Sequence, residues 1–373
     1  MAALLAQREV ENRHLLFKTA IVQSMPMGIQ FRTKQQAKDL AKEFLGKINC
    51  TDSILPVYNW DCARRKSTEE VAAVVGRMNE PIDFNHLSSL FETWAPILDE
   101  DILDMHPYDA FLAGRSQERN IIAGHTSGEG ATFVYGILRE PVGKQLYQIL
   151  VQGYFRNDTV SEKILEYYPS DCRVTDRDCD MRPSISQIIN SYLFACPLRR
   201  SLKNRAQVTL ERETPALGRI NSFLPGRTFR YIFDHPTEVP GVAVCGNVSC
   251  HTAELPYIFQ TFEEMGLSPS EEELTLSDRM INFWTNFAWS GDPNQGSDQF
   301  WDQLRDPVGY NLTDCWHQYM DKEDYLDNCG SRGQFFLASE YLTTGEQNHF
   351  MVEPVEIDRN CNFWDDLDIY LDY

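Results

Sequence analysis

The sequence predicts an α/β protein in which helices flank a mainly parallel β-sheet. Two apolar runs, around residues 15–22 and over Asn120–Gly124, are continuous, as in strands buried on both faces of a parallel sheet. Residues 34–47, which lie between these runs, carry apolar side chains at helical spacing. Strand-like and helical segments therefore succeed one another along the chain, which is the pattern of an α/β fold.

The first part of the chain supplies the earliest of these elements. Residues 11–24 are predicted to complete a helix and then to form the first strand. Residues 34–47 form a helix, and a loop bracketed by Cys50 and Cys62 follows it. Ser67-Thr-Glu-Glu70 has the pattern of a capping box, so we expect a helix to begin there and to run through Val75.

The middle of the chain continues the alternation. The run Asn120–Gly124 ends at a glycine, as a buried strand would. Thr159 and Glu162 have the spacing of a helix cap. Helical spacing recurs over Ile185–Phe194, and Thr228–Asp234 is predicted to be a strand.

A long helix is predicted in the last third, with Ser277 as its cap and Ser290-Gly-Asp-Pro-Asn294 as its end. Its apolar stripe consists of Met280, Ile281, Trp284, Phe287 and Ala288. A stripe at helical period indicates a core-facing surface rather than a cofactor site. A short strand is expected at Gln334–Leu337, followed by a final segment around Cys361–Trp364.

Composition excludes several classes of protein. The chain has 373 residues, of which 42% are hydrophobic, so it can bury a large core. Its net charge of -21 disfavours binding to nucleic acid, because an acidic surface repels phosphates. Since no run approaches about eighteen apolar residues, we expect no membrane span.

Cysteines and sequons indicate a secreted or endomembrane protein. The cysteine count is ten, an even number, which suits a set of disulfides. Candidate glycosylation sites with the Asn-x-Ser/Thr pattern are Asn49, Asn157, Asn247 and Asn311. The segment Met1–Gln7 is too short for a signal peptide, so we expect the true N-terminus to lie further upstream.

His251 is a candidate general base. It directly follows the pair Cys245 and Cys250, and a helix-like run over Glu254–Phe262 comes next. A disulfide between these cysteines would close a tight loop and fix the backbone that presents the imidazole. Histidine titrates nearest to neutral pH and commonly acts as a base. The alternative is a loop histidine without a catalytic task.

Glu129 is a candidate acid partner. It lies in the turn His125-Thr-Ser-Gly-Glu-Gly130, directly after the strand predicted at Asn120–Gly124. Flanking glycines let the backbone turn sharply and carry a carboxylate above the strand end, which is where open α/β sheets place their sites. The alternative is a solvated turn residue.

Cofactor and metal sites are not expected. The chain has no phosphate-binding glycine loop of either standard spacing. It also lacks zinc-finger cysteine spacing and His-Glu-x-x-His. We therefore expect neither a cofactor nor a metal.

Four segments resemble the type-B carboxylesterases and cholinesterases, a family with the α/β-hydrolase fold. The resemblance as a whole spans nearly the whole chain, from about residue 14 to about residue 365, and four segments carry it most clearly. The segments are Phe17–Ser24, Gly124–Phe133, Cys250–Phe259 and Leu276–Asn294, and the last is the strongest match. The order of strand, acid, strand and histidine agrees with the triad order of this fold.

The resemblance implies roles and disulfide pairs. His251 would be the general base, and Glu129 would orient its imidazole. The implied disulfides are Cys50–Cys62, Cys172–Cys179, Cys196–Cys361, Cys245–Cys250 and Cys315–Cys329. Two positions depart from the family pattern, since Thr252 replaces a glycine and Gly128 replaces a frequent aspartate.

The nucleophile is the main departure, because the chain has no Gly-x-Ser-x-Gly sequence. We expect residues 1–373 to form a single carboxylesterase domain that is truncated at its N-terminus. The serine and the oxyanion loop would lie upstream of residue 1. The implied function is hydrolysis of a small-molecule carboxylic ester by a Ser-Glu-His mechanism. The alternative is an inactive cholinesterase-like binding or structural protein. Retention of both Glu129 and His251 favours the enzyme.

Overall fold

The computed structural model describes residues 17–29, 31–51, 58–75, 78, 94–115, 119–170, 172, 179–213, 226–293, 336–338 and 355–370. Within these ranges a four-stranded parallel sheet has the order β1-β4-β5-β6. Its strands are β1 (Thr19–Gln23), β4 (Asn120–Thr126), β5 (Thr228–Phe233) and β6 (Phe336–Ala338). A second, two-stranded parallel sheet pairs β2 (Arg32–Thr33) with β3 (Ile97–Leu98). The parallel sheet predicted from the apolar runs is confirmed.

The central strands are buried on both faces. All six residues of β5 are buried, and all but the first residue of β4 are buried. The register pairs Thr19 with Asn120 and Ile121 with Thr228, so the three strands end near one another at their carboxyl ends. Burial on both faces explains why these strands read as continuous apolar runs.

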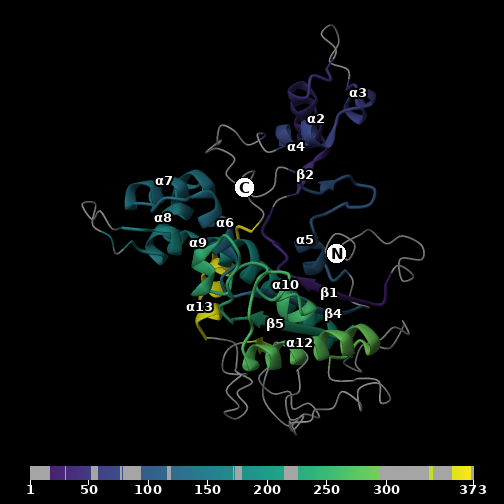
Figure 1. The fold of residues 1–373 in the computed structure, drawn as a ribbon, viewed down its shortest axis with the longest axis vertical. Helices are drawn as coiled ribbons and strands as arrows, with labels where there is room; N and C mark the ends of the chain where they lie inside the picture. Colours follow the sequence, from purple (N-terminus) through teal and green to yellow (C-terminus); the bar gives the residue numbers. More distant parts are fainter. Residues whose placement is uncertain are drawn as a thin grey trace.

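Helices cover the two faces of the sheet (Figure 1). The long helix α12 (Glu271–Ser290) and the short helix α11 (Leu255–Phe259) pack against one face, where Phe229, Tyr231 and Phe233 of β5 meet α12. On the other face, α5 (Pro107–Leu112) and α10 (Cys196–Glu213) contact β1 and β4. The stripe of α12 is core, as predicted, because Met280, Trp284 and Phe287 are buried.

Two helix starts differ from the sequence prediction. The cap of α12 is Ser270, which forms a capping box with Glu273, whereas Ser277 is internal and donates a 2.6 Å hydrogen bond to the Tyr257 carbonyl. The sequence did not indicate this start, because the first turn of α12 is polar and the apolar periodicity begins only after that turn. The cap of α8 (Asp158–Tyr167) is Asn157 rather than Thr159.

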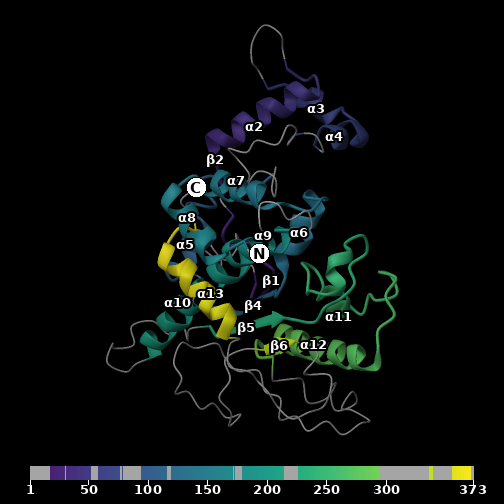
Figure 2. The same ribbon diagram turned by 90° about the vertical axis from the view of Figure 1, so that its left-hand side faces the viewer.

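A second core lies beside the sheet and is built from helices. It contains α7 (Lys144–Phe155), α8, α9 (Arg182–Ile189) and α13 (Val355–Leu367). Residues Asn190–Ala195 form a π-helix that joins α9 to α10, so the helical segment predicted at Ile185–Phe194 is continuous but changes its period. Figure 2 shows α13 crossing beside α10, and Trp364 of α13 is fully buried in this core.

A small helical group contains α2 (Lys34–Lys47), α3 (Trp60–Arg64) and α4 (Thr68–Val75). It lies at the top of Figures 1 and 2. The helix predicted at residues 34–47 is confirmed with the same bounds. The capping box at Ser67 and Glu70 is also confirmed, since each side chain accepts a hydrogen bond from the other residue's backbone N–H.

Four of the five implied disulfides are present. They are Cys50–Cys62, Cys172–Cys179, Cys196–Cys361 and Cys245–Cys250. The pair Cys315–Cys329, the candidate glycosylation site Asn311 and the helix expected at the start of the chain lie outside the described residues. Asn49, Asn157 and Asn247 are exposed. Among the described residues, no helix is long and apolar enough to cross a membrane.

Candidate active site

Two loops at the carboxyl ends of β4 and β5 bring Glu129 and His251 together. Glu129 is the first residue of α6 (Glu129–Ile137), which begins two residues after β4. His251 lies between a short 3-10 turn, Ala243–Gly246, and α11. The two loops touch where Gly128 N–H donates a 2.8 Å hydrogen bond to the Ser249 carbonyl.

Gly128 permits this close approach. A Cβ atom at this position would lie 2.8 Å from the Ser249 carbonyl oxygen, so a side chain would push the histidine loop away. The disulfide Cys245–Cys250 closes the same loop, and both cysteines are fully buried against Ala131 of α6. The departure from the family's acid turn therefore suits the loop that faces it.

Glu129 and His251 form a directly bonded pair. The distance from His251 Nδ1 to Glu129 Oε2 is 2.5 Å. Glu129 is fully buried, whereas 26% of the His251 side chain is exposed. The second carboxylate oxygen of Glu129, Oε1, accepts a 2.6 Å hydrogen bond from Thr126 N–H. The carboxylate is therefore held on both sides, and the imidazole faces the pocket.

The electrostatics of the pair favour a basic imidazole. Burial lowers the pKa of His251, but the hydrogen bond that the ring donates to Glu129 and the charges of Glu129 and Glu254 outweigh burial and raise this pKa above its ordinary value. A carboxylate only accepts hydrogen bonds, so His251 Nδ1 donates and the Nε2 lone pair stays available. This tautomer is the one that a general base needs.

A second buried carboxyl, Glu254, lies beside this pair and was missed by the sequence reasoning. It is 1% exposed, and Gln23 Nε2 donates a 3.0 Å hydrogen bond to its Oε1. Gln23 in turn accepts from Trp284 Nε1 at 3.3 Å. Burial and the nearby charge of Glu129 raise the pKa of Glu254. Its position in an otherwise apolar run was the available signal, because a lone acid among buried residues is unusual.

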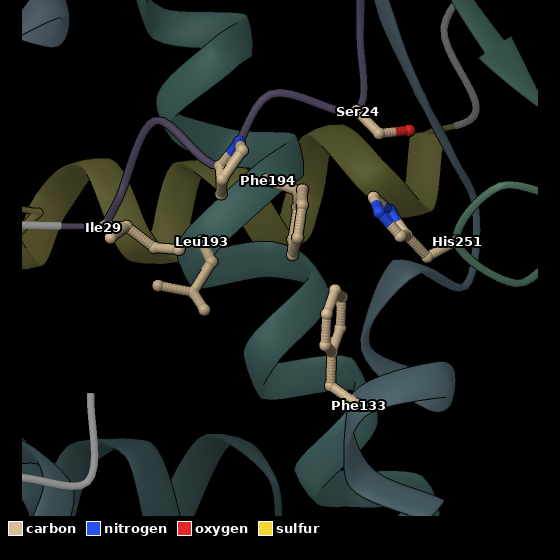
Figure 3. A pocket seen from close by; sticks show the side chains of 7 residues that line it. Ser24, Ile29, Phe133, Leu193, Phe194 and His251 are labelled. Atoms are coloured by element: carbon tan, nitrogen blue, oxygen red, sulfur yellow. The ribbon is translucent and has the colours of Figure 1, made fainter. Parts of the chain in front are cut away.

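A mainly apolar pocket of about 260 Å³ opens beside His251. Its walls are Ser24, Pro26, Ile29, Phe133, Leu193, Phe194 and His251. Figure 3 shows the rings of Phe133 and Phe194 next to the imidazole, with Ser24 above it. The ring centroids of Phe133 and Phe194 lie 5.1 and 5.8 Å from that of His251. The pocket therefore offers an apolar space within reach of a base.

Two residues at this site have left-handed backbones. Thr252, which follows His251, has φ +75°, and Ser24, which follows β1, has φ +48°. This region favours glycine, which is the residue that the resemblance described above implies at the position of Thr252. Strained residues of this kind cluster at functional sites.

Histidine and carboxylate side chains can also bind metal ions. Among the residues that the structure describes, no group of three or more His, Cys, Asp or Glu side chains is arranged to hold a metal ion. The groups around His251 are an imidazole and a buried carboxylate in direct contact, an arrangement that is chemically capable of proton transfer.

Several known proteins are similar in sequence to about three quarters of this chain. The chain is similar to the cAMP-regulated D2 protein of Dictyostelium discoideum, with 28% identity over 76% of this chain and 48% of that protein. Crystal protein of the same organism is 26% identical over 79% of this chain and 48% of its own length. Neuroligin-2 of Rattus norvegicus is 23% identical over 75% of this chain and 32% of its own length. The chain thus spans half or less of the length of these relatives.

Solved structures show the same fold. A structure named PNB esterase superposes with a TM-score of 0.57 at 18% identity, and the match covers 86% of this chain and 54% of that one. A thermophilic PNB esterase gives the same TM-score at 20% identity. The fold is accordingly that of an α/β-hydrolase, as predicted.

The profile of the Carboxylesterase family matches residues 1–327, which is most of the chain. The Glu129–His251 pair, the parallel sheet that carries it and this match agree. The chain belongs to the carboxylesterase family.

Proposed function

We propose that this chain is the C-terminal portion of a carboxylic ester hydrolase and supplies the base and the acid of a Ser-Glu-His triad. The observation that carries the proposal is the 2.5 Å hydrogen bond between His251 Nδ1 and buried Glu129 at the carboxyl end of a parallel sheet. The serine would come from a part of the protein outside this chain, which spans about half the length of its esterase-fold relatives.

In this proposal His251 acts twice. Its Nε2 takes the proton of the serine hydroxyl as the oxygen attacks the ester carbonyl, and the imidazolium then returns that proton to the leaving alcohol. Water attacks the resulting acyl-enzyme by the same route. Glu129 keeps Nδ1 protonated and stabilises the imidazolium, since it lies buried at bonding distance.

The pocket supports a neutral organic substrate. Apart from His251, its walls are apolar side chains and the Ser24 hydroxyl, so it offers no ionic partner to a charged group. A small-molecule ester that places an uncharged portion against Phe133 and Phe194 fits these walls. Nucleic acid does not fit a protein with a net charge of -21.

A non-catalytic role is the second candidate. The observation that favours it is the absence of Gly-x-Ser-x-Gly from all 373 residues. In that case the protein would bind a partner through the same fold, and the Glu129–His251 pair would have a structural task. Ester turnover by the complete gene product distinguishes the two candidates.

The decisive experiment begins with the DNA upstream of the Met1 codon. We expect a reading frame that encodes Gly-x-Ser-x-Gly within about ten codons and, further upstream, a signal peptide. The complete product should hydrolyse a short-chain nitrophenyl ester, and His251→Ala should abolish turnover. A continuous coding sequence with another residue in place of the serine would favour the non-catalytic role.

The 373-residue chain expressed alone gives a second test. We expect no ester hydrolysis, because loss of a triad serine costs about 10⁶ in kcat. We also expect aggregation, because a parallel sheet cut part-way leaves apolar faces uncovered. Ser24→Ala is the informative variant, since Ser24 is the hydroxyl in this pocket. Turnover that is lost in both Ser24→Ala and His251→Ala would make Ser24 the nucleophile and refute the upstream serine.

Secretion and glycosylation are part of the proposal. Four disulfides in the described residues suit an oxidising compartment. Asn49, Asn157 and Asn247 are exposed, so an oligosaccharide could reach them. Peptide mapping of protein from its native source should find glycans on at least one of these sites, and their absence from all three would contradict this part of the proposal.

A further inference from the structure

Helix α6 begins without a cap of its own. Its N-cap residue is Gly128, which has no side chain to accept a hydrogen bond. The first turn is nevertheless inside the protein, since Glu129, Gly130 and Ala131 are all buried. The amide groups of a buried helix start need acceptors, and an N–H group left without one is costly.

Asn190 supplies the acceptor for the first of these N–H groups, that of Glu129. Its side-chain carbonyl, Oδ1, accepts a 3.1 Å hydrogen bond from the backbone N–H of Glu129. Asn190 is the first residue of the π-helix Asn190–Ala195. Short π-helical insertions are rare and are frequent at functional sites.

The same π-helix forms one wall of the pocket. Leu193 and Phe194 line it, and the Leu193 carbonyl accepts a 3.0 Å hydrogen bond from Gly28 N–H. A Cβ atom at Gly28 would lie 2.4 Å from the Tyr192 carbonyl oxygen, so the loop and the π-helix are in close contact. The pocket wall is therefore fixed from both sides.

Helix α6 and the π-helix meet in two contacts four residues apart. The first joins Glu129 N–H to Asn190, and the second stacks Phe133 on Phe194 with centroids 5.9 Å apart and planes 18° apart. Both of these rings also pack against His251. One contact thus holds the acid, and the other confines the imidazole that the acid orients.

We propose that Asn190 is a positioning residue of this site, whose side chain replaces the missing cap of α6 and holds Glu129 where it meets His251. The effect of Asn190 on catalysis rests on the proposed function, whereas its hydrogen bond with Glu129 N–H does not depend on that function. Because Asn190 and the pocket wall belong to one π-helix, a group that fills the pocket presses on the same element that holds the acid.

The contact of Glu129 with His251 tolerates only a small displacement of either side chain. Removing the Asn190 side chain leaves the Glu129 N–H without its acceptor, and the start of α6 then moves to find water or another partner. A displacement of about 1 Å at a reacting group can cost about 10²-fold in rate. The bond to His251 is therefore the first feature to loosen.

The test compares Asn190→Ala with Asn190→Asp in the complete product of the gene. Aspartate keeps an acceptor for Glu129 N–H and adds a negative charge, whereas alanine removes the acceptor. The groups that face the pair are Glu254 before α11, Tyr231 of β5 and His125 of β4. None of these changes in either variant, so differences between the two arise at position 190.

NMR of the labelled imidazole measures two quantities. These are the pKa of His251 and the intensity of its downfield Nδ1 proton signal. In Asn190→Ala we expect that proton signal to weaken and the pKa of His251 to fall, because the raising effect of Glu129 is diminished. In Asn190→Asp we expect the signal to persist and the pKa to rise. For an active enzyme, the acid limb of kcat/KM follows these shifts, and Asn190→Ala loses about 10- to 100-fold in kcat with KM little changed.

Asn204→Ala is the matched control, since Asn204 lies further along the same helical run in α10 and its Oδ1 has no hydrogen-bond partner among the described residues. It should leave the His251 signals unchanged. A purely structural Asn190 would lower stability in Asn190→Ala without moving the His251 signals, and that result overturns the proposal. If the protein hydrolyses no ester, the NMR readouts still decide the role of Asn190, so the two proposals fail separately.

Discussion

Glu129 and His251 show how much of a candidate site one sequence can predict. Both were predicted from local signals, one a carboxylate in a glycine-flanked turn and the other a histidine after a short cysteine loop. Their 2.5 Å contact across 122 residues follows from the parallel order of β4 and β5, which places both loops at one edge of the sheet. The hydrogen-bond partner of Glu254 could not be predicted, because it is Gln23, which Trp284 contacts in turn, and both come from distant elements.

Glu129→Gln tests the orientation of the imidazole. The amide can donate to Nδ1 and so favour the wrong tautomer, and the pKa of His251 should fall because the carboxylate that raises it is gone. In an active product we expect kcat to fall by about 10⁴, as for the corresponding change in a serine protease. Glu254→Gln is the comparison variant. It should also lower the pKa of His251 but cost much less in kcat, since Nδ1 keeps its partner; equal losses would contradict the assignment.

Thr252→Gly tests the strain next to His251. Thr252 has φ +75°, a conformation that costs an L-residue about 1–2 kcal/mol. Glycine relieves this strain, but its greater freedom in the unfolded chain costs about 0.5–1 kcal/mol of stability, so we expect a net stabilisation of up to about 1.5 kcal/mol. Thr261→Gly, at a position outside the left-handed region, should destabilise. Urea denaturation of both variants measures the difference, and a less stable Thr252→Gly would show that the threonine makes compensating contacts.

At the scale of elements, the contact between α6 and α9 is the one that shapes the site. A Cβ atom at Gly130 of α6 would lie 2.1 Å from the Ser186 carbonyl oxygen of α9, so only glycine allows this approach. The approach in turn permits the two contacts of α6 with the π-helix. The glycine was visible in the sequence, but its reason lies in a helix more than fifty residues away.

Gly130→Ala should force α6 away from α9. Overpacking of this kind costs about 1–3 kcal/mol, and we also expect the His251 Nδ1 signal to weaken as Phe133 and Glu129 move. Gly136→Ala, on the same helix with no atom near its Cβ, should instead stabilise by about 0.5–1 kcal/mol. Thermal unfolding of both variants, compared with the wild type, gives the two signs. A tolerated Gly130→Ala would mean that α6 and α9 can separate freely.

Element boundaries divide into those that the sequence predicts and those that tertiary structure decides. The bounds of α2 agree with the prediction, because its apolar residues recur at helical spacing from Ala37 to Leu45 and a capping box of Thr33 and Gln36 closes its start. The start of α12 does not, because Glu271–Glu273 are polar and belong to the cap rather than the stripe. The π-helix is invisible for another reason, since a segment of six residues, five of them buried, does not distinguish its period from that of an α-helix.

For the whole molecule, stability depends on pH through two buried histidines. Burial lowers the pKa values of His106 and His125 to about 4, although backbone carbonyl acceptors partly oppose it. His106 is also the cap of α5, and its Nδ1 accepts from Tyr108 N–H, which requires the neutral ring. The unfolded chain takes up protons below about pH 6.5 and the folded chain only near pH 4, so stability falls with acidification across this window.

We therefore expect each histidine to remove up to about 3 kcal/mol of unfolding free energy between pH 6.5 and 4. His251 acts in the opposite sense, because its pKa is raised: its contribution is present below about pH 6.5 and is lost as pH rises through its folded value. His106→Asn retains a capping oxygen but cannot titrate, so its stability should depend less steeply on pH. Denaturation curves at several pH values measure the slope, and an unchanged slope would exclude His106 as a cause.

The disulfides tie distant parts of the fold together to different degrees. Cys196 and Cys361 are 165 residues apart, and a cross-link of that span is worth about 5 kcal/mol in the chain-entropy model. Cys172 and Cys179 are seven residues apart, so their bond is worth about 2–3 kcal/mol. Replacing each pair by serines should reproduce this order in denaturation midpoints. Peptide mapping that finds Cys196 as a free thiol would remove this argument.

These sequence separations also determine the order in which the disulfides can form during synthesis. As the chain leaves the ribosome, Cys50 meets Cys62 and Cys245 meets Cys250 almost at once, whereas Cys196 must wait for Cys361, which is synthesised 165 residues later. During that interval Cys196 is a reduced thiol in a chain whose other cysteines are being oxidised around it. Mispairing is then a kinetic hazard at one cysteine, and correct maturation should depend on a catalyst of thiol–disulfide exchange that acts after α13, which carries Cys361, has emerged.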